Sequence, residues 1–266
     1  MSIFSQNYFV TNDCMSIDYK LTPIGVIMFF QDCFAQYMTT KNIAAFDIID
    51  DNMYWVVSEF NVEFEEDAPF WSEKIDVNVW ISELKKLRLY ADFELTHRGK
   101  TFAKGNSCWY ILSTETHRPL AIDKIAGCFP INEKLMLGEH TKISFDIPVE
   151  KISEYTHKIN LGDIDFNNHV NNKSYINIAE STISKGYRDK HFLKNLTVKF
   201  IKESFLYDEL VCSTYKTDDK NTFIHRITKF DDPVCEIKTQ WQEKTLNNDI
   251  KNYDLQIRQE SLVGSL

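Results

Sequence analysis

Apolar and polar residues follow two distinct periods along this chain. Residues 23–38 are apolar around most of the circumference of a helix, and Pro23 stands at their start, where a helix makes no use of an N–H group. Residues 171–185 place apolar or small side chains at i, i+3, i+4 and i+7, from Tyr175 to Thr182, which is the spacing of an amphipathic helix. We therefore predict one long helix in each half of the chain.

Both predicted helices are followed by segments in which apolar and polar residues alternate, as they do in half-buried β-strands. One helix followed by a run of antiparallel strands, written twice, indicates a tandem α+β protein. The join lies near residues 124–144, where glycine and proline interrupt the pattern, and the tail from Leu246 is polar and peripheral. The predicted strands are residues 55–64, 75–81, 88–96, 107–112, 196–200, 210–215, 222–230 and 235–241.

The strands that follow each helix also match in sequence. Residues 60–77 align without a gap on residues 196–213, and both blocks begin with alternating apolar positions. Such a repeat indicates two copies of one structural unit, although short alternating segments also match by chance. The matched pairs are Val62 with Val198, Phe64 with Phe200, Asp67 with Glu203, Trp71 with Tyr207, and Ile75 with Val211.

The composition narrows the class of protein. The chain has 266 residues, 43% of them hydrophobic and 14% aromatic, which is enough for one large core or two smaller ones. Its formal net charge of −9 argues against a nucleic-acid-binding protein, because binding the phosphate backbone requires a basic surface. The 6 scattered cysteines include no CxxC pair, so we expect buried free thiols in a reducing compartment.

Several common signals are missing from the sequence. The N-terminus has no basic segment followed by an apolar core, and no apolar run approaches the ~20 residues that span a membrane, so we expect a cytoplasmic protein. The histidines show no metal-ligand spacing, and there is no glycine-rich phosphate loop or nucleotide fingerprint. We therefore predict neither a metal nor a cofactor.

The densest group of chemically useful residues precedes the second predicted helix. Asp165, Asn167 and His169 stand at alternate positions in a turn that follows a strand-like stretch at residues 157–160. An acid, an amide and an imidazole beside the unpaired N–H groups of a helix start are suited to attack on a carbonyl and to binding the resulting oxyanion. The same residue types also cap helices and build turns, and spacing alone favours that structural interpretation.

The turn resembles a known signature. Asp165, Asn167 and the run from His169 to Ile176 match the D-x-N-x-H-V-N-N-x-x-Y-I segment of plant and bacterial acyl-acyl carrier protein thioesterases. Similarity in the family's order extends over residues 5–245. The resemblance implies a hydrolase that cleaves the thioester of fatty acyl-acyl carrier protein, which releases a free fatty acid and ends chain elongation in fatty acid biosynthesis.

The resemblance also implies a tandem, or double, hotdog fold. Two long helices would each be wrapped by an antiparallel β-sheet, with the two sheets continuous. Residues 1–130 would form an N-terminal hotdog that binds the acyl chain and has a degenerate site, and residues 131–266 would form a catalytic C-terminal hotdog. The corresponding turn of the first repeat, at residues 18–25, keeps Asp18 but has no Asn or His partner.

The family's catalytic positions transfer to named residues of this chain. Asp165, Asn167 and His169 fall on three of them, Glu203 falls on the family glutamate, and Ser204 stands where plant members have a cysteine. Because that thiol is absent, attack by water is the simpler mechanism, and we expect Glu203 or Asp165 to position and deprotonate the water. His169 would orient that carboxylate or protonate the leaving thiolate, while Asn167 and helix amides would hold the carbonyl oxygen. Ser204 as the nucleophile is the alternative, and it would need an adjacent base.

Other functions and partners follow from the same resemblance. An acyl-CoA thioesterase on the same fold is the nearest alternative, and a non-catalytic acyl-thioester-binding protein is a more distant one. The expected partner is acyl carrier protein, which is acidic, and the chain is compatible with a monomer or a homodimer. Cations after the second helix offer a docking surface, although solvated charge is the simpler interpretation. They are Lys185, Arg188, Lys190, Lys194, Lys199 and Lys202.

Overall fold

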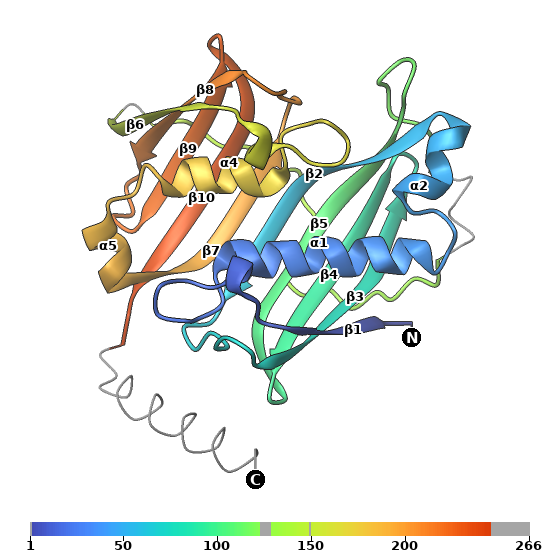
Figure 1. Ribbon diagram of the computed structural model, residues 1–266, viewed down its shortest axis with the longest axis horizontal. Coiled ribbons are helices and arrows are strands. Elements are labelled where there is room, and N and C mark those ends of the chain that lie inside the picture. Colours follow the sequence, from blue (N-terminus) through green and yellow to red (C-terminus); the bar gives the residue numbers. More distant parts are fainter. Residues whose placement is uncertain (1, 123–128, 149, 246–266) are drawn as a thin grey trace.

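The computed structural model describes residues 2–122, 129–148 and 150–245, and an antiparallel β-sheet of ten strands forms its centre (Figure 1). The strands are β1 (Phe4–Phe9), β2 (Met53–Phe64), β3 (Lys74–Lys85), β4 (Arg88–His97), β5 (Lys100–Ser113), β6 (Lys151–Lys158), β7 (His191–Phe200), β8 (Glu209–Lys216), β9 (Thr222–Lys229) and β10 (Asp232–Glu243). They lie in the order β1-β3-β4-β5-β2-β7-β10-β9-β8-β6.

All the strands predicted from the alternation are present, most of them extended by a few residues. The edge strands were not fully predicted. The alternation indicates only the last part of β6 and nothing of β1. β6 is exposed along most of its length, so it has no apolar face that a sequence pattern could report.

One sheet runs through both halves of the chain. β2 and β7 pair antiparallel, from Glu59 opposite Lys199 to Glu63 opposite Asn195. This ladder provides the continuity that the resemblance implies. Because side chains alternate along a strand, the sheet turns one face toward the helices and the other face away from them.

The helices cover one face of the sheet, α1 over the first half and α4 over the second (Figure 1). α1 (Pro23–Thr39) begins where the sequence predicts it, with Pro23 in the first position and the Thr22 hydroxyl accepting the Gly25 N–H at 3.0 Å. The second helix is broken into α4 (Asn172–Glu180) and α5 (Lys185–Lys190). The shorter helical segments are α2 (Ala45–Ile48), η1 (Asn12–Cys14), η2 (Ile49–Asp51) and η3 (Leu161–Asp163).

The break after α4 has a local cause. The Ser181 hydroxyl donates to the carbonyl of Asn177 at 2.8 Å, and the Thr182 hydroxyl donates to that of Ala179 at 2.6 Å. Ser184 then caps α5. Hydroxyl side chains that bind the nearby backbone compete with helical hydrogen bonding. The prediction of one long helix over residues 171–185 is therefore wrong, because helical spacing does not report these competing bonds.

Backbone hydrogen bonds repeat in the segments that enter α1 and α4. The 3₁₀ helices η1 and η3 each lead into a turn that is closed by an isolated β-bridge. Tyr19 and Asn168 occupy equivalent positions in the two turns, and both have a left-handed φ, of 60° and 62°. The two turns therefore follow one backbone path with different side chains.

The repeat continues after β2 and β7, but with a shift of one residue. Ser72 and Tyr207 share a left-handed φ, of 65° and 71°, and their N–H groups bind the carbonyls of Val10 and Ile159, which are themselves equivalent. The loop before them is thus one residue shorter in the second half. The predicted pairs up to Phe64 with Phe200 hold. Later pairs need correction: Ser72 rather than Trp71 matches Tyr207, Leu210 rather than Val211 matches Ile75, and, counting back through the loop, Ala68 rather than Asp67 matches Glu203.

Aromatic residues fill the space between α1 and the sheet. Phe30 stacks on Phe93 with 4.7 Å between ring centroids, and Phe34 stacks on Trp109 with 4.0 Å. Each fully buried large side chain contributes about 1.5–3 kcal/mol of burial free energy. This aromatic layer fixes α1 on β4 and β5.

The equivalent space under the second half contains a buried polar cluster among its apolar residues. His225 of β9 is fully buried at the position that Phe93 occupies in β4, and its ring nitrogens lie 2.8 Å from the Thr214 hydroxyl and 2.9 Å from that of Thr239. Thr182, at the helix break, reaches the same cluster at 3.3 Å. Burial lowers the pKa of His225 to about 3, so the ring is neutral at physiological pH.

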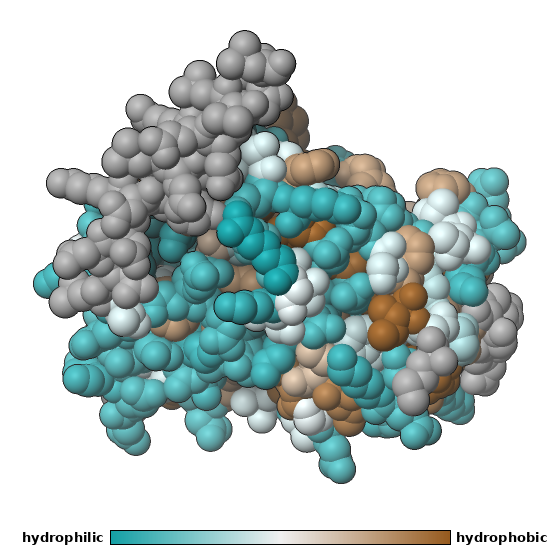
Figure 2. All heavy atoms as spheres, turned by 90° about the horizontal axis from the view of Figure 1, so that it is seen from below, coloured by the Kyte–Doolittle hydropathy of each residue, from teal (hydrophilic) through white to brown (hydrophobic). Residues whose placement is uncertain are grey.

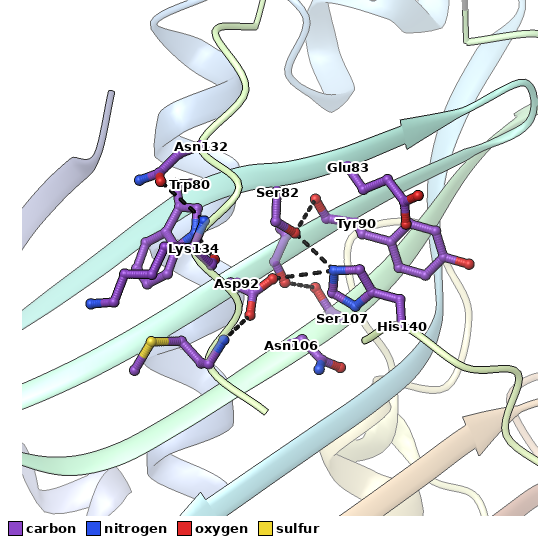
Figure 3. Close-up of polar contacts among 12 residues, drawn as sticks. Trp80, Ser82, Glu83, Tyr90, Asp92, Asn106, Ser107, Asn132, Lys134 and His140 are labelled. Carbon is purple, nitrogen blue, oxygen red and sulfur yellow. Dashed lines mark hydrogen bonds and ion pairs between the residues drawn. The ribbon is translucent and has the colours of Figure 1, made fainter. Parts of the chain in front are cut away.

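Residues 129–148 cross the face of the sheet that points away from α1. Trp80, which alternates with core residues on β3, donates its indole N–H to the carbonyl of Lys134 at 2.7 Å (Figure 3). The N–H of Met136 donates to the buried carboxylate of Asp92 at 2.7 Å. Polar bonds from β3 and β4 thus hold this connecting segment against the sheet.

Several predictions concern single residues or the surface. The cysteines at positions 14, 33, 108, 212 and 235 are buried and free, as predicted, whereas Cys128, part of the predicted join and the tail from Leu246 lie outside the described residues. The face seen from below is mainly hydrophilic, with hydrophobic residues in small separate groups (Figure 2). Within the described ranges, no helix is long and apolar enough to cross a membrane.

Candidate active site

The Asp165–His169 turn is held together by its own first residue. The Asp165 N–H donates to the His169 carbonyl at 2.9 Å, and the Asn168 N–H donates to the Asp165 carbonyl at 3.1 Å. The Asp165 carboxylate accepts the N–H groups of Asn167 at 2.8 Å and of His169 at 3.3 Å. For Asp165, the turn-forming interpretation of the sequence therefore describes the contacts that are present.

The start of α4 offers fewer free donors than the sequence analysis predicts. Asn171 is the N-cap, and its side chain accepts the Lys173 N–H at 3.0 Å, while its carbonyl accepts the Ser174 N–H at 2.8 Å. The first three residues of α4 are Asn172, Lys173 and Ser174. Of these, and among the described residues, only Asn172 has an N–H group without an acceptor. The prediction of several unpaired amides is corrected to this single donor, beside the cavity described below.

Glu203 reaches the turn from the loop after β7. The carbonyl of Ser204 accepts the Val170 N–H at 2.9 Å, which ties this loop to the end of the turn. Glu203 Oε1 lies 3.6 Å from His169 Nδ1, and the two side chains are 34% and 27% exposed. The His169 ring also meets Phe205 edge to face at 5.2 Å. Tertiary structure thus brings the distant glutamate to the histidine.

Ser204 lies close to the turn in the chain but has a different environment. Its side chain is fully buried, and in the described part of the chain its hydroxyl lies near the Tyr175 hydroxyl and makes no hydrogen bond to a carboxylate or an imidazole. It is not among the residues that line the cavity beside Glu203.

One cavity of about 660 Å³ joins the polar residues to the first half of the chain. Asp165, Asn167, His169 and Glu203 line one part of it. Its volume falls in the range of small-molecule sites, about 300–1,000 Å³. Side chains of α1, the strands beside it and α4 form the apolar part: Met28, Phe34, Ala35, Met38, Trp55, Val57, Trp109, Tyr175 and Phe200.

Comparison with family models covers both halves of the chain. Residues 2–125 match the acyl-ACP thioesterase N-terminal domain, and residues 147–243 match the acyl-ACP thioesterase C-terminal domain. The chain belongs to the acyl-ACP thioesterase family. The resemblance drawn from the signature turn is therefore confirmed.

Individual relatives of this acyl-ACP thioesterase family member are distant. The chloroplastic palmitoyl-acyl carrier protein thioesterase of Arabidopsis thaliana is 22% identical over 216 residues, covering 76% of this chain and 52% of the relative. The chloroplastic oleoyl-acyl carrier protein thioesterase 2 of the same plant is 24% identical over 212 residues, covering 75% and 55%. The chain spans about half the length of the curated relatives it matches.

Solved structures show the same fold. A crystal structure of an acyl-ACP thioesterase from Bacteroides thetaiotaomicron has a TM-score of 0.81 at 19% identity, covering 90% of this chain and 98% of that one. The 12:0-ACP thioesterase of Umbellularia californica has a TM-score of 0.80 at 17% identity, covering 91% and 98%. The family member described here thus has the hotdog-type architecture of these thioesterases, with a large antiparallel sheet and few helices.

Two residues at the site of this family member have no signal in the sequence analysis. The Tyr54 hydroxyl lies 3.4 Å from Glu203 Oε1 and 3.1 Å from His117 Nδ1, and both Tyr54 and His117 line the cavity. Burial and the Glu203 carboxylate raise the pKa of Tyr54 to about 12. Tyr54 lies one residue before the strand predicted at residues 55–64, and His117 has no partner at a recognisable spacing, so neither could be chosen before the fold was known.

A second meeting of serine, histidine and aspartate lies under the connecting segment (Figure 3). The Ser82 hydroxyl and the Asp92 carboxylate lie 2.9 Å and 3.4 Å from the same atom, Nε2 of His140. In a catalytic triad the acid and the serine use different ring nitrogens. Since Asp92 and His140 are also buried, this cluster anchors residues 129–148 and does not form a hydrolytic triad.

Metal binding has no geometric support in the ranges that the structure describes. No group of three or more His, Cys, Asp or Glu side chains there is arranged to hold a metal ion.

Proposed function

We propose that this chain hydrolyses the thioester of fatty acyl-acyl carrier protein to a free fatty acid and holo-acyl carrier protein. The cavity that joins His169 and Glu203 to an apolar wall carries the proposal. A thioester carbonyl at the polar end would let the hydrocarbon chain lie along that wall, where its burial is favourable. Family membership and the activity that the relatives are named for support the same substrate class.

Glu203 is the better candidate for the general base. The Asp165 carboxylate already accepts two backbone N–H groups of its own turn. Glu203 faces the cavity and His169 instead. We therefore assign Glu203 to positioning and deprotonating the attacking water, and Asp165 to holding the turn that presents Asn167 and His169.

Proton and electron movements balance without a covalent enzyme intermediate. The water oxygen bonds to the thioester carbon while one of its protons passes to Glu203. The tetrahedral intermediate then collapses, the carbon–sulfur bond breaks, and its electron pair leaves with sulfur. His169, which contacts Glu203 through Nδ1, donates its own ring proton to the thiolate and takes up at Nδ1 the proton held by the Glu203 carboxyl group, so that Glu203 is again a carboxylate.

The developing oxyanion needs donors that are already in place. We assign this role to the Asn167 side chain and the Asn172 N–H, both at the cavity. One such donor is worth about 10²–10³ in rate. Asn172 is the first residue of α4, so the helix dipole adds to the attraction for negative charge.

Attack by water is favoured over attack by Ser204. A serine nucleophile must reach the substrate and needs a base within hydrogen-bonding distance. Ser204 is fully buried, and within the described residues its hydroxyl makes no hydrogen bond to a group that could act as a base. We expect Ser204→Ala to retain most of the activity.

The two halves divide the work in this proposal. Residues 1–130 form an N-terminal hotdog that supplies the acyl wall through α1 and β2, and residues 131–266 form a catalytic C-terminal hotdog in a double hotdog with one continuous sheet. The ladder between β2 and β7 supports this arrangement, because it fixes the acyl wall relative to the turn.

The partner would be acyl carrier protein, whose acidic surface requires cations near the cavity. Several of the cations expected to form a docking surface are occupied: Lys185 pairs with Asp189, Lys194 with Glu63 and Glu65, Lys199 with Glu236, and Lys202 with Asp232. This leaves Arg188 and Lys190 of α5 as the members of the set to test. Charge reversal at both should raise KM for the acyl carrier protein substrate, and an unchanged KM would dismiss the surface.

Thiol release from matched substrates tests the activity. The purified chain is given the same acyl groups on acyl carrier protein and on CoA, over a series of chain lengths. We expect a higher kcat/KM with acyl carrier protein. Faster turnover of acyl-CoA would make the chain an acyl-CoA thioesterase, and binding without thiol release would make it a non-catalytic acyl-thioester-binding protein.

A further inference from the structure

The first half of the chain contributes two polar side chains to the site, although its own turn is degenerate. Tyr54 comes from β2, and His117 comes from the turn that follows β5. The Tyr54 hydroxyl lies between Glu203 Oε1, at 3.4 Å, and His117 Nδ1, at 3.1 Å. His169 Nδ1 lies 3.6 Å from the same glutamate oxygen. Oε1 of Glu203 is therefore approached by one residue from each half.

The direction of each hydrogen bond from His117 through Tyr54 to Glu203 follows from which groups can donate. An ionised carboxylate only accepts, so the single hydroxyl proton of Tyr54 must point to Glu203 for that bond to form. The Tyr54 oxygen is then an acceptor, and His117 must carry a proton on Nδ1 to donate to it. Because the pKa of Tyr54 is raised to about 12, its hydroxyl keeps that proton throughout the neutral range.

The turn that carries His117 is built to hold one conformation. His117 has a φ of 53°, which is uncommon for a residue other than glycine. Its N–H donates to the Ser113 carbonyl at 2.9 Å, while the Ser113 hydroxyl accepts the N–H groups of Glu115 and Thr116 at 3.3 and 3.2 Å. An unfavourable backbone conformation persists only where the surrounding bonds enforce it, and such positions concentrate at functional sites.

We propose that Tyr54 is a positioning residue for Glu203, and that His117 positions Tyr54 in turn. Tyr54 would hold Oε1 and leave the other carboxylate oxygen for the attacking water. This inference rests on the proposed function, in which Glu203 is the general base. It assigns the first half a part in the chemistry as well as in acyl binding, because a carboxylate anchored from both halves is in place only when the halves are joined through β2 and β7.

Removal of the Tyr54 hydroxyl tests the proposal directly. Tyr54→Phe should lower kcat about 10-fold or more, as expected for one hydrogen bond to a charged group, with KM changed less than about twofold. It should also move the acid limb of the kcat/KM profile upward by about half a pH unit or more, because a carboxylate that loses a donor becomes more basic. Tyr110→Phe on β5 is the matched control and should leave both the rate and the profile unchanged.

His117 provides a second test, because substitution of this exposed residue does not disturb the core. Its side chain is exposed, so His117→Ala should fold normally and lower kcat about three- to tenfold, while His117→Gln, which keeps a donor, should recover most of the loss. If Tyr54→Phe fails to fold, the pair of His117 variants decides the matter. Equal activity of both with the wild type would overturn the proposal.

A double variant separates this inference from the function beneath it. In a Glu203→Gln background, Tyr54→Phe should have little further effect, because Tyr54 acts through the carboxylate. If the wild type shows no thioesterase activity, the proposed function fails. If the wild type is active and Glu203→Gln is impaired, but Tyr54→Phe keeps the wild-type kcat and pH profile, only the role of Tyr54 is refuted.

Discussion

The turns that lead into α1 and α4 have the same backbone path but carry different side chains. Both follow a 3₁₀ helix, close with one isolated bridge and contain a left-handed residue at the same place. Each residue of the second half to which we assign a role at the site, in the turn or beside it, has a different residue at the equivalent position of the first half. The replacements, first half against second, are Ser16 for Asp165, Asp18 for Asn167, Lys20 for His169, Pro23 for Asn172 and Ala68 for Glu203.

These replacements show that backbone path and chemistry are separable. Lys20 lies over the Phe70 ring at 5.3 Å, just as His169 contacts Phe205 at 5.2 Å, so even the aromatic partner is kept. Ala68 brings no carboxylate to the first turn, and Pro23 has no N–H for an oxyanion. The first turn keeps the geometry of a site without its donors, acid or base. The Asp18 noted in the sequence corresponds to Asn167 rather than to Asp165, so it is not a remnant of the acid.

The largest effect should come from replacing Glu203 with alanine, the residue at the equivalent position of the first half. Glu203→Ala should lower kcat by about 10²–10⁴, the usual range for a lost general base, while the chain remains folded. Steady-state thiol release with circular dichroism as a check on folding measures this. Glu209→Ala, an exposed carboxylate of the same half, is the control and should keep full activity. Near-normal turnover in Glu203→Ala would remove the glutamate from the mechanism.

The next effect should come from giving α4 the first residue of α1. Asn172→Pro fits the backbone, since Asn171 already has the extended conformation that precedes proline and the first helical position tolerates it. The substitution deletes one N–H donor and should cost about 10²–10³ in kcat. Asn172→Ala keeps the N–H and separates its effect from that of the side chain. Equal rates for the proline and alanine variants would rule out the amide as an oxyanion donor.

A third difference between the halves concerns stability. Since the pKa of His225 is about 3 in the fold and ordinarily 6.5, the unfolded chain takes up a proton at a higher pH than the folded chain does. Stability is therefore lost as the pH falls below 6.5, by about 2–3 kcal/mol at pH 4.5. Denaturant unfolding at pH 7 and pH 4.5 measures the loss, and His225→Gln should reduce it by that amount. An identical pH dependence in the variant would contradict a neutral buried His225.

The smallest effect should come from rebuilding the first turn. Ser16→Asp combined with Lys20→His, placed in the inactive Glu203→Ala chain, should change the residual rate less than about threefold, because Ala68 still offers no base and Pro23 no donor. Thiol release by this triple variant is the measurement. Restored activity would mean that the side chains of the turn suffice for the chemistry without a carboxylate or an amide donor beside it.

Most of the strands and the helix α1 could be predicted from the pattern of apolar and polar residues. The strands that bury one face have a period of two, and α1 has an uninterrupted apolar surface with a proline at its start, so both were predicted closely. The edge strand β6 is exposed along most of its length, the edge strand β1 is only half-buried on one face, and the hydroxyl groups that end α4 leave the helical spacing intact, so these features were missed. The register error after β2 arose because matching sequences without a gap cannot detect a loop that is one residue shorter.

The signature turn, the repeat of a helix followed by strands, and the family could be recognised in the sequence, because they depend on residue types at short spacings. The contacts between distant groups became visible only in the folded chain. The tertiary structure brought Glu203 to His169 across the loop after β7, and it brought Tyr54 and His117 from the other half to the same carboxylate. It also buried Ser204 away from the cavity. Contacts between residues far apart in the chain are set by how the sheet and helices pack, and no local spacing encodes them.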